Sequence, residues 1–294
     1  MRSLNLISYA KLNLYLEVLG KHPDNYHSIS TLFERISLFD QIRLRLLPQR
    51  EIRIVSSNPS LPLGRKNLAF QAASLLKREF KVSQGVEINI KKHIPVACGL
   101  GGGSGNAAAV LVGLNRLWKL NLEVNQLVSL GRLIGADIPF FIYDCSFAWG
   151  THYGDEIKVL KLPVKLWHII VVPRIKVLSS LIYKRWDEST AKTTGRTSLH
   201  QSLLRMLKSG LLKKDFLKLK LLLFNSLERV SSAVYPVISR VKSLLSDLGL
   251  EAISMSGSGP AVFGLVSSRK EAYAVARQLK VKEENWDVFV ARTV

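Results

Sequence analysis

Cysteine is nearly absent from the 294 residues of this chain, which contain only Cys98 and Cys145. Two cysteines cannot frame a fold of this size, so a small protein held together by disulfides is excluded. Neither residue lies in a spacing typical of a zinc site. We expect both to be reduced thiols, as is usual in cytosolic proteins.

Long hydrophobic runs are also lacking. The longest uncharged run, Ile94 to Asn115, contains Pro95 and six glycines, so it is not the ~20 continuous apolar residues that a membrane span requires. Near the amino terminus Lys11 interrupts a short apolar stretch, and no clean cleavage site follows. The sequence therefore predicts no membrane span, no signal peptide and a cytoplasmic location.

Acidic residues are scarce: 22 Asp and Glu stand against 42 Lys and Arg, a formal net charge of +20. Such an excess is compatible with a nucleic-acid binder, a membrane-surface protein or an enzyme for anionic substrates. The basic residues are scattered, and their densest cluster, Lys208 to Lys220, alternates with leucine. This pattern predicts an amphipathic helix with a solvated basic face, which permits polyanion binding without requiring it.

The remaining composition is that of a globular protein, with 47% apolar and 22% charged residues. The first half is rich in strand patterns, and the second half alternates helix and strand. We therefore predict an α+β fold with two lobes, covering residues 1–155 and 156–294. The predicted strands are 4–19, 31–39, 41–47, 51–56, 85–92, 165–173, 252–255, 261–266 and 286–291; the predicted helices are 67–80, 106–120, 124–134, 198–207, 215–223, 235–248 and 269–279. We expect the segment 147–153, which is followed by Gly154, to close the first lobe.

The strongest local signal is a glycine-rich loop, Pro95 to Asn106, which lies between a predicted strand and an alanine-rich helix. Glycines let the backbone N–H groups turn toward a ligand, and the following helix directs its positive end to the same place. The loop is thus an anion cradle suited to phosphate, to which Ser104 adds a hydroxyl for a phosphate oxygen or Mg²⁺. It is neither a P-loop nor a dinucleotide fingerprint, and a linker or a tight packing turn is the alternative.

Three weaker signals accompany this loop. Asp137 in Gly-Ala-Asp-Ile-Pro is a carboxylate among apolar residues, which needs a cationic or hydrogen-bonding partner unless it caps a helix. The segment 256–260, Ser-Gly-Ser-Gly-Pro, precedes a strand, and a simple hairpin turn is its alternative explanation. Tyr26 and His27 lie in a turn where an aromatic ring and an imidazole can hold a flat base.

Taken together, the glycine loop, Lys11-Leu-Asn13, Gly-Ala-Asp137-Ile-Pro and Ser-Gly-Ser-Gly-Pro resemble the GHMP kinases. The resemblance implies an N-terminal α/β lobe of a type also found in ribosomal proteins, a ferredoxin-like C-terminal lobe, and an active site between them. It implies ATP as the phosphoryl donor, with Mg²⁺. Within the family, Tyr26-His27 and the extended loop with Asn106 resemble the members whose alcohol substrate is a cytidine diphosphate-linked methylerythritol, phosphorylated on its 2-hydroxyl on the route to isoprenoid precursors.

The resemblance also implies roles for individual residues. Asp137 matches the catalytic base and Lys11 the cation beside it; Asn13, Tyr26, His27 and Tyr183 match substrate-binding positions, and Ser104 a metal-binding one. The residues that match positions around ATP are Pro95, Gly99, Leu100, Gly101, Gly102, Gly103, Ser104, Gly105 and Asn106 in the loop, and Asn67, Leu68 and Lys92 near the adenosine.

Four positions depart from the family pattern. Tyr9 replaces a usual Pro, Asn25 a usual Gly, Gly105 a usual second Ser, and Ala261 a common small polar residue, which is a minor change. Asn tolerates a positive φ better than most residues, so we expect the turn at Asn25 to survive.

Two alternatives stay open. One is a GHMP kinase for mevalonate, homoserine or a sugar, against which Tyr26-His27 argues because those substrates have no base to stack. The other is a basic nucleic-acid-binding protein that keeps the fold without catalysis. We expect a small-molecule kinase with no nucleic-acid or membrane partner, as a monomer or weak homodimer.

Overall fold

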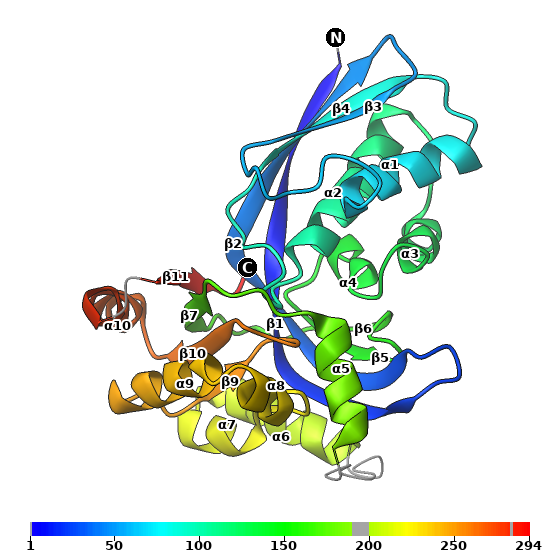
Figure 1. Cartoon of the computed structure of the whole chain (residues 1–294). Coiled ribbons are helices and arrows are strands. Elements are labelled where there is room, and N and C mark those ends of the chain that lie inside the picture. Colours follow the sequence, from blue (N-terminus) through cyan, green and yellow to red (C-terminus); the bar gives the residue numbers. More distant parts are fainter. Residues whose placement is uncertain (1, 190–199, 283–284) are drawn as a thin grey trace.

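A computed structural model describes residues 2–189, 200–282 and 285–294 and arranges them in two β-sheets with helices (Figure 1). In chain order the elements are β1 (Ser3–Lys21), β2 (His27–Leu47), β3 (Ile52–Ser56), α1 (Leu68–Glu79), β4 (Gly85–Lys91), α2 (Gly102–Leu117), α3 (Val124–Arg132), α4 (Ile138–Ile142), β5 (Phe147–Thr151), β6 (Glu156–Leu160), β7 (Trp167–Pro173), α5 (Ser179–Glu188), α6 (His200–Lys213), α7 (Phe216–Leu222), β8 (Phe224–Asn225), α8 (Glu228–Val234), α9 (Val237–Asp247), β9 (Ile253–Met255), β10 (Val262–Val266), α10 (Arg269–Lys282) and β11 (Trp286–Arg292).

Two very long strands organise the first sheet. β1 has 19 residues and β2 has 21, and they pair antiparallel along almost their whole length, which at strand geometry is ~60 Å. The sheet order is β3-β4-β2-β1-β8, and the β5–β6 hairpin joins through β2. The sequence predicted two strands, 31–39 and 41–47, where the chain forms the single strand β2, because hydrogen-bonded pairing to β1 continues through that region.

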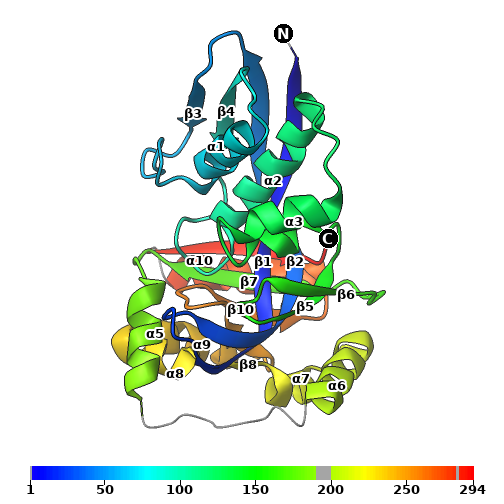
Figure 2. The same ribbon diagram turned by 90° about the vertical axis from the view of Figure 1, so that its right-hand side faces the viewer.

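Helices α1, α2 and α3 lie on one side of the upper part of this sheet (Figure 2). Small residues on α2 let its backbone lie close to strands β1 and β2. A Cβ at Gly113 would lie 2.5 Å from the side chains of Leu6 in β1 and Leu44 in β2. The buried face of α2 joins the core of this lobe through Ala107, Val110, Leu111 and Leu114.

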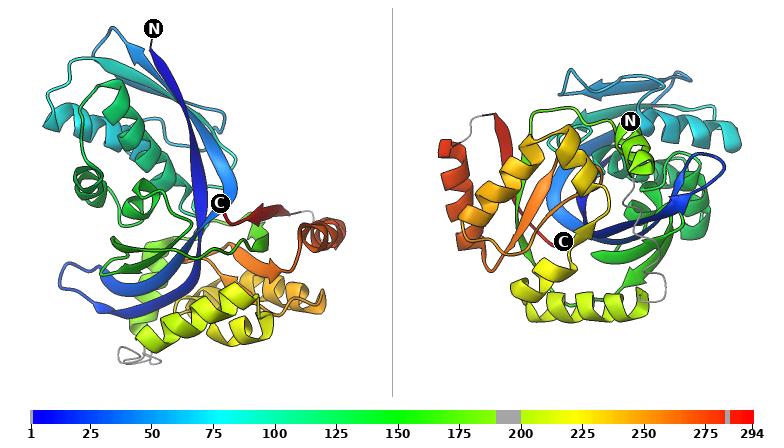
Figure 3. Two further views of the ribbon diagram at one scale, coloured as in Figure 1. Left: turned by 180° about the vertical axis from the view of Figure 1, so that it is seen from behind. Right: turned by 60° about the horizontal axis from the view of Figure 1, so that its bottom comes forward.

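The second sheet has the order β11-β7-β10-β9 and is antiparallel throughout. Numbered within the lobe, this order is 4-1-3-2, the ferredoxin-like arrangement that the resemblance to the GHMP kinases implied. Helices α9 and α10 pack against this sheet, as the views from behind and below show (Figure 3). The two-lobe α+β fold is confirmed.

One hydrophobic cluster joins the two sheets. It contains Leu12 and Tyr15 of β1 together with Ile170 of β7 and Phe263 of β10. The short strand β8, from the second half of the chain, pairs in parallel with β1. The predicted division between residues 155 and 156 falls in the turn between β5 and β6, and it remains a prediction.

Several elements differ from the sequence prediction. α2 begins at Gly102 and not at residue 106, because the glycines themselves form its first turn. Helices α4, α5 and α8 were not predicted. The basic cluster at 208–220 spans parts of two helices, α6 and α7, and not one helix. The first two residues of the helix predicted at 198–207 lie outside the described residues. None of the described helices is long and apolar enough to cross a membrane.

Candidate active site

The glycine loop is anchored at its start by one buried carboxylate. Asp40 Oδ1 accepts hydrogen bonds from the backbone N–H groups of His93 (2.7 Å) and Ile94 (2.9 Å), and its Oδ2 accepts from Lys92 Nζ at 2.6 Å. Asp40 and the Lys92 side chain are almost completely buried. Burial lowers the pKa of Lys92, while the neighbouring Asp40 charge opposes that shift. These bonds hold the turn that follows β4.

At two positions of the loop only glycine fits, because neighbouring atoms lie where a Cβ would be. Gly99 has φ +85°, and a Cβ there would lie 2.1 Å from the backbone oxygen of Ser256. Gly101 is the N-cap of α2 and has φ +68°, in the left-handed region, where a Cβ would lie 2.9 Å from the Lys11 side chain. No other residue type fits at these two places without moving its neighbours.

The Ser-Gly-Ser-Gly-Pro segment is the turn between β9 and β10, and it also supports the glycine loop. Ser256 Oγ donates to the Gly99 carbonyl oxygen at 2.9 Å and accepts from the Asn13 backbone N–H at 3.2 Å. A Cβ at Gly257 would lie 3.3 Å from the Gly99 Cα. The turn therefore does more than close a hairpin: it joins the glycine loop to β1.

Lys11 and Asp137 meet beside this loop. Lys11 Nζ lies 3.4 Å from Asp137 Oδ2, and the Lys11 side chain is buried whereas that of Asp137 is 32% exposed. The same ammonium donates to Asn13 Oδ1 at 2.5 Å, and Asn13 Nδ2 donates to Thr31 Oγ1 at 2.8 Å. Asp137 precedes the first residue of α4 and makes no side-chain capping bond, so the helix-cap alternative does not occupy its carboxylate.

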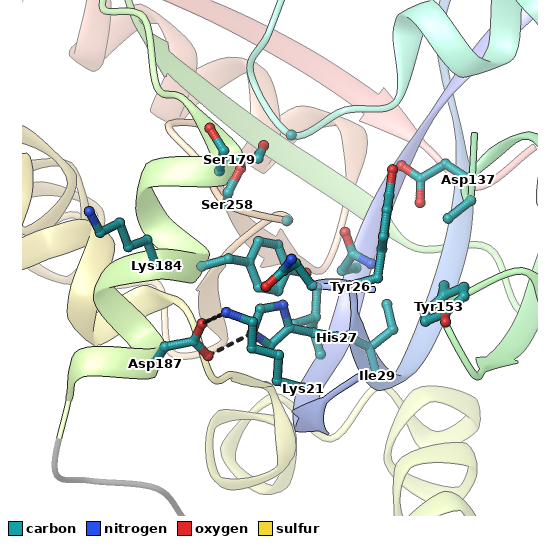
Figure 4. A pocket seen from close by; sticks show the side chains of 18 of the residues that line it. Lys21, Tyr26, His27, Ile29, Asp137, Tyr153, Ser179, Lys184, Asp187 and Ser258 are labelled. Carbon is teal, nitrogen blue, oxygen red and sulfur yellow. Dashed lines mark hydrogen bonds and ion pairs between the residues drawn. The ribbon is translucent and has the colours of Figure 1, made fainter. Parts of the chain in front are cut away.

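A cavity of about 860 Å³ opens from this pair and extends to the β1–β2 hairpin and α5. Eight of the predicted site residues, from separate parts of the sequence, line this cavity: Lys11, Asn13, Tyr26, His27, Gly99, Ser104, Asp137 and Tyr183. In the close view, Asp137 lies on the far side of this pocket from His27 (Figure 4).

The hairpin end of the cavity is aromatic. Tyr26 is 63% exposed, and its ring centroid lies 5.4 Å from that of Tyr153. His27 stacks on Tyr183 with ring centroids 4.8 Å apart. Burial, and then the charge of Asp137, raise the pKa of the Tyr183 phenol, which stays neutral. Asn25 adopts φ +69°, as the turn requires.

Sequence reasoning missed the charged residues at this end. Asp187 accepts from His27 Nε2 at 2.7 Å and from Lys21 Nζ at 2.9 Å. Partial burial acts to raise the pKa of Asp187, but the hydrogen bonds from His27 and Lys21 hold it below its ordinary value. Asp187 and the cavity-lining Lys184 lie on α5, whose existence the sequence pattern did not reveal, so no signal placed them near His27.

Other predicted site residues do not line this cavity. Asn67 caps α1, since its Oδ1 accepts from the Ala69 N–H and its Nδ2 donates to the Pro62 carbonyl oxygen. Gly105 packs on β1, where a Cβ would lie 2.8 Å from Ser8 Oγ. The remainder lie around the start of α2 or beneath it, and they are Leu68, Lys92, Pro95, Leu100, Gly101, Gly102, Gly103 and Asn106.

Few protein side chains at this site can coordinate a metal ion. Among the described residues no three His, Cys, Asp or Glu side chains come together as a metal-binding group. The Ser104 hydroxyl lines the cavity and has no side-chain partner in the described part of the chain. This donor set fits Mg²⁺ bound mainly through phosphate oxygens and water.

Comparison with known proteins gives the family of this chain. The family models for the GHMP kinases N terminal domain and the GHMP kinases C terminal domain match residues 67–145 and 207–283. The 4-diphosphocytidyl-2-C-methyl-D-erythritol kinases of Bacillus pumilus and Geobacillus kaustophilus are each 40% identical to this chain, over 92% and 90% of it and over 91% and 88% of their own lengths.

Solved structures give the same result. A 4-(cytidine 5'-diphospho)-2C-methyl-D-erythritol kinase superposes with a TM-score of 0.81 at 29% identity, covering 98% of each chain. A homoserine kinase from Cytophaga hutchinsonii shares the fold, with a TM-score of 0.76 at 23% identity over 100% of this chain and 95% of its own. The chain therefore belongs to the GHMP kinase family and, within it, to the 4-diphosphocytidyl-2-C-methyl-D-erythritol kinases.

Proposed function

We propose that this chain transfers the terminal phosphoryl group of ATP to the 2-hydroxyl of 4-diphosphocytidyl-2-C-methyl-D-erythritol, a step in the methylerythritol phosphate route to isoprenoid precursors. The observation that carries the proposal is a single cavity lined by two groups of side chains. The Lys11–Asp137 ion pair lies beside the glycine loop, and aromatic side chains that can hold a base lie at the β1–β2 hairpin. The extent of similarity to kinases of that name supports the choice of substrate.

Tyr26, His27 and Tyr183 are the proposed binding residues for the cytosine. The exposed face of Tyr26 offers a stacking surface, and His27 supplies a polar edge beside the ring of Tyr183. This slot distinguishes the proposal from a kinase for mevalonate or homoserine, whose substrates carry no base.

The phosphates of ATP are the proposed ligands of the glycine loop. The first N–H groups of α2, at residues 102–104, have no intrahelical acceptor, and the helix dipole is positive at that end. Ser104 is the proposed protein ligand of Mg²⁺, which when bound neutralises phosphate charge. Lys92 and Asn67 support the surrounding backbone, because their polar atoms are already engaged.

Asp137 is the proposed acceptor of the proton from the substrate hydroxyl, and Lys11 the proposed stabiliser of the negative charge on that oxygen. Phosphoryl transfer needs little covalent help, so orientation and charge stabilisation carry most of the rate increase. Asn13 holds Lys11 in place through the 2.5 Å hydrogen bond from the ammonium group.

The test is ATP consumption, coupled to an indicator reaction, with the purified chain. We expect turnover with 4-diphosphocytidyl-2-C-methyl-D-erythritol and only background consumption with mevalonate, homoserine or galactose. Turnover of one of those three in its place would overturn the proposed substrate. Salt-dependent RNA binding without any turnover would favour the non-catalytic alternative.

A further inference from the structure

Helix α5 presents polar side chains to the cavity along one face. Tyr183, Lys184 and Asp187 all line the cavity, and Asp187 follows Tyr183 by four residues and Lys184 by three, so their side chains lie on the same face of the helix. Asp187 faces the β1–β2 hairpin, where its two carboxylate oxygens bind two different residues, Lys21 and His27. Figure 4 shows Asp187 joined to both by dashed lines.

The imidazole of His27 is held on several sides. Tyr183 stacks on it, and Trp186 meets it edge-on with centroids 5.8 Å apart and planes at 89°. Asp187 fixes its Nε2 at 2.7 Å, and only 8% of the residue is exposed. The ring cannot turn over without losing these contacts.

The second ring nitrogen of His27 has no fixed partner. Nδ1 makes no hydrogen bond to any residue in the described ranges, and it retains some contact with solvent. A carboxylate accepts hydrogen bonds only, so in the neutral imidazole Asp187 places the proton on Nε2 and leaves Nδ1 as an acceptor.

We infer that Asp187 is a positioning residue that makes this kinase selective for cytosine over uracil, because it sets the tautomer of His27. This inference rests on the proposed function. Cytosine carries an exocyclic amino donor where uracil carries a carbonyl acceptor. An acceptor at Nδ1 pairs with the amino group and meets the uracil carbonyl with no hydrogen atom between them.

The decisive variant is Asp187→Asn. Lys21 Nζ only donates and keeps the amide oxygen on its side, so the amide nitrogen faces His27 and donates to Nε2. The imidazole proton then moves to Nδ1, and the reason to reject uracil is removed. We expect the ratio of kcat/KM for the cytidine substrate to that for its uridine analogue to fall at least ~10-fold, within the range of a mismatched hydrogen bond. The KM for ATP should not change.

Two further variants serve as matched controls. Lys21→Met removes the other partner of Asp187 and leaves the His27 bond in place, so the selectivity ratio should stay within about twofold. Asp187→Glu keeps a carboxylate and should retain most of the selectivity. An unchanged ratio in Asp187→Asn, or an equal fall in Lys21→Met, refutes the inference.

A second measurement needs no substrate. Nitrogen-15 NMR of the free protein reports the tautomer of His27, assigned by its loss in His27→Gln. The Nε2–H form is expected in the native chain and a shift toward Nδ1–H in Asp187→Asn. If the native chain holds the Nδ1–H form, the inference fails although the proposed function stands; if no cytidine substrate is turned over, the proposed function fails whatever the tautomer.

Discussion

Replacing Asp137 with Asn tests the centre of the proposed mechanism. The substitution keeps the shape of the side chain and removes its charge and its ability to take a proton. At the 3.4 Å separation of Lys11 Nζ and Asp137 Oδ2, Coulomb's law gives ~5 kcal/mol at an effective dielectric constant of ~20 and ~1 kcal/mol in bulk water. Because Asp137 is about one-third exposed, the lower part of this range applies.

The expected rate loss follows from these magnitudes. General-base catalysis contributes ~10²-fold to ~10⁴-fold, and each ~1.4 kcal/mol is a factor of ten. We therefore expect kcat to fall at least ~10²-fold in Asp137→Asn. The affinity for ATP should change less than about threefold, since no glycine-loop amide is altered.

The assay is steady-state turnover of 4-diphosphocytidyl-2-C-methyl-D-erythritol, with nucleotide binding measured by calorimetry. Asp144→Asn is the matched control, because Asp144 follows α4 and its carboxylate is fully exposed beside Arg35. It should retain near-native turnover. A near-native rate for Asp137→Asn would show that the carboxylate is not the base.

Three other predictions concern residues in and around the glycine loop. Gly99→Ala should abolish nucleotide binding, because its Cβ would overlap a backbone oxygen at 2.1 Å. Gly249→Ala has nearly the same φ of +86° but nothing within 4 Å, so it should cost only the ~1–2 kcal/mol of a left-handed alanine and keep ATP affinity. Burial raises the pKa of Cys98 to about 11, so its alkylation in the native protein should stay slow at pH 8.5 and increase as the pH approaches 11, with Cys145 reacting first; rapid labelling of Cys98, read by mass spectrometry, would contradict this. Asp40→Asn leaves a buried ammonium group without its charge partner and should lower the free energy of unfolding in urea by ~3–5 kcal/mol, whereas a loss below ~1 kcal/mol would show that the pair is dispensable.

Local patterns predicted most of the regular structure. The alternating residues of β1 and the alanine-rich face of α2 both have a clear period, and both elements are present. Helix α5 was missed because its apolar residues are few and only Ile182 and Trp186 are buried. Helix α4 has five residues, too few to show a period.

The sequence predicts a single helix over the basic cluster at 208–220, because leucine and lysine alternate through it. Asp215 caps a new helix there: its Oδ1 accepts from the Lys218 backbone N–H at 3.0 Å. Leu219 is buried and Leu221 is 83% exposed. A pattern of leucines alone does not say which of them face the core.

By itself the sequence determined the local chemistry of the proposed phosphate site, because a glycine run before a helix offers backbone N–H groups to an anion, and the family resemblance pointed to Lys11 and Asp137 beside it. The tertiary structure alone decided how the proposed base site is built. His27 and Asp187 are 160 positions apart and meet because α5 packs against the β1–β2 hairpin. A contact across that separation has no local period, so only the packed fold brings its two partners together.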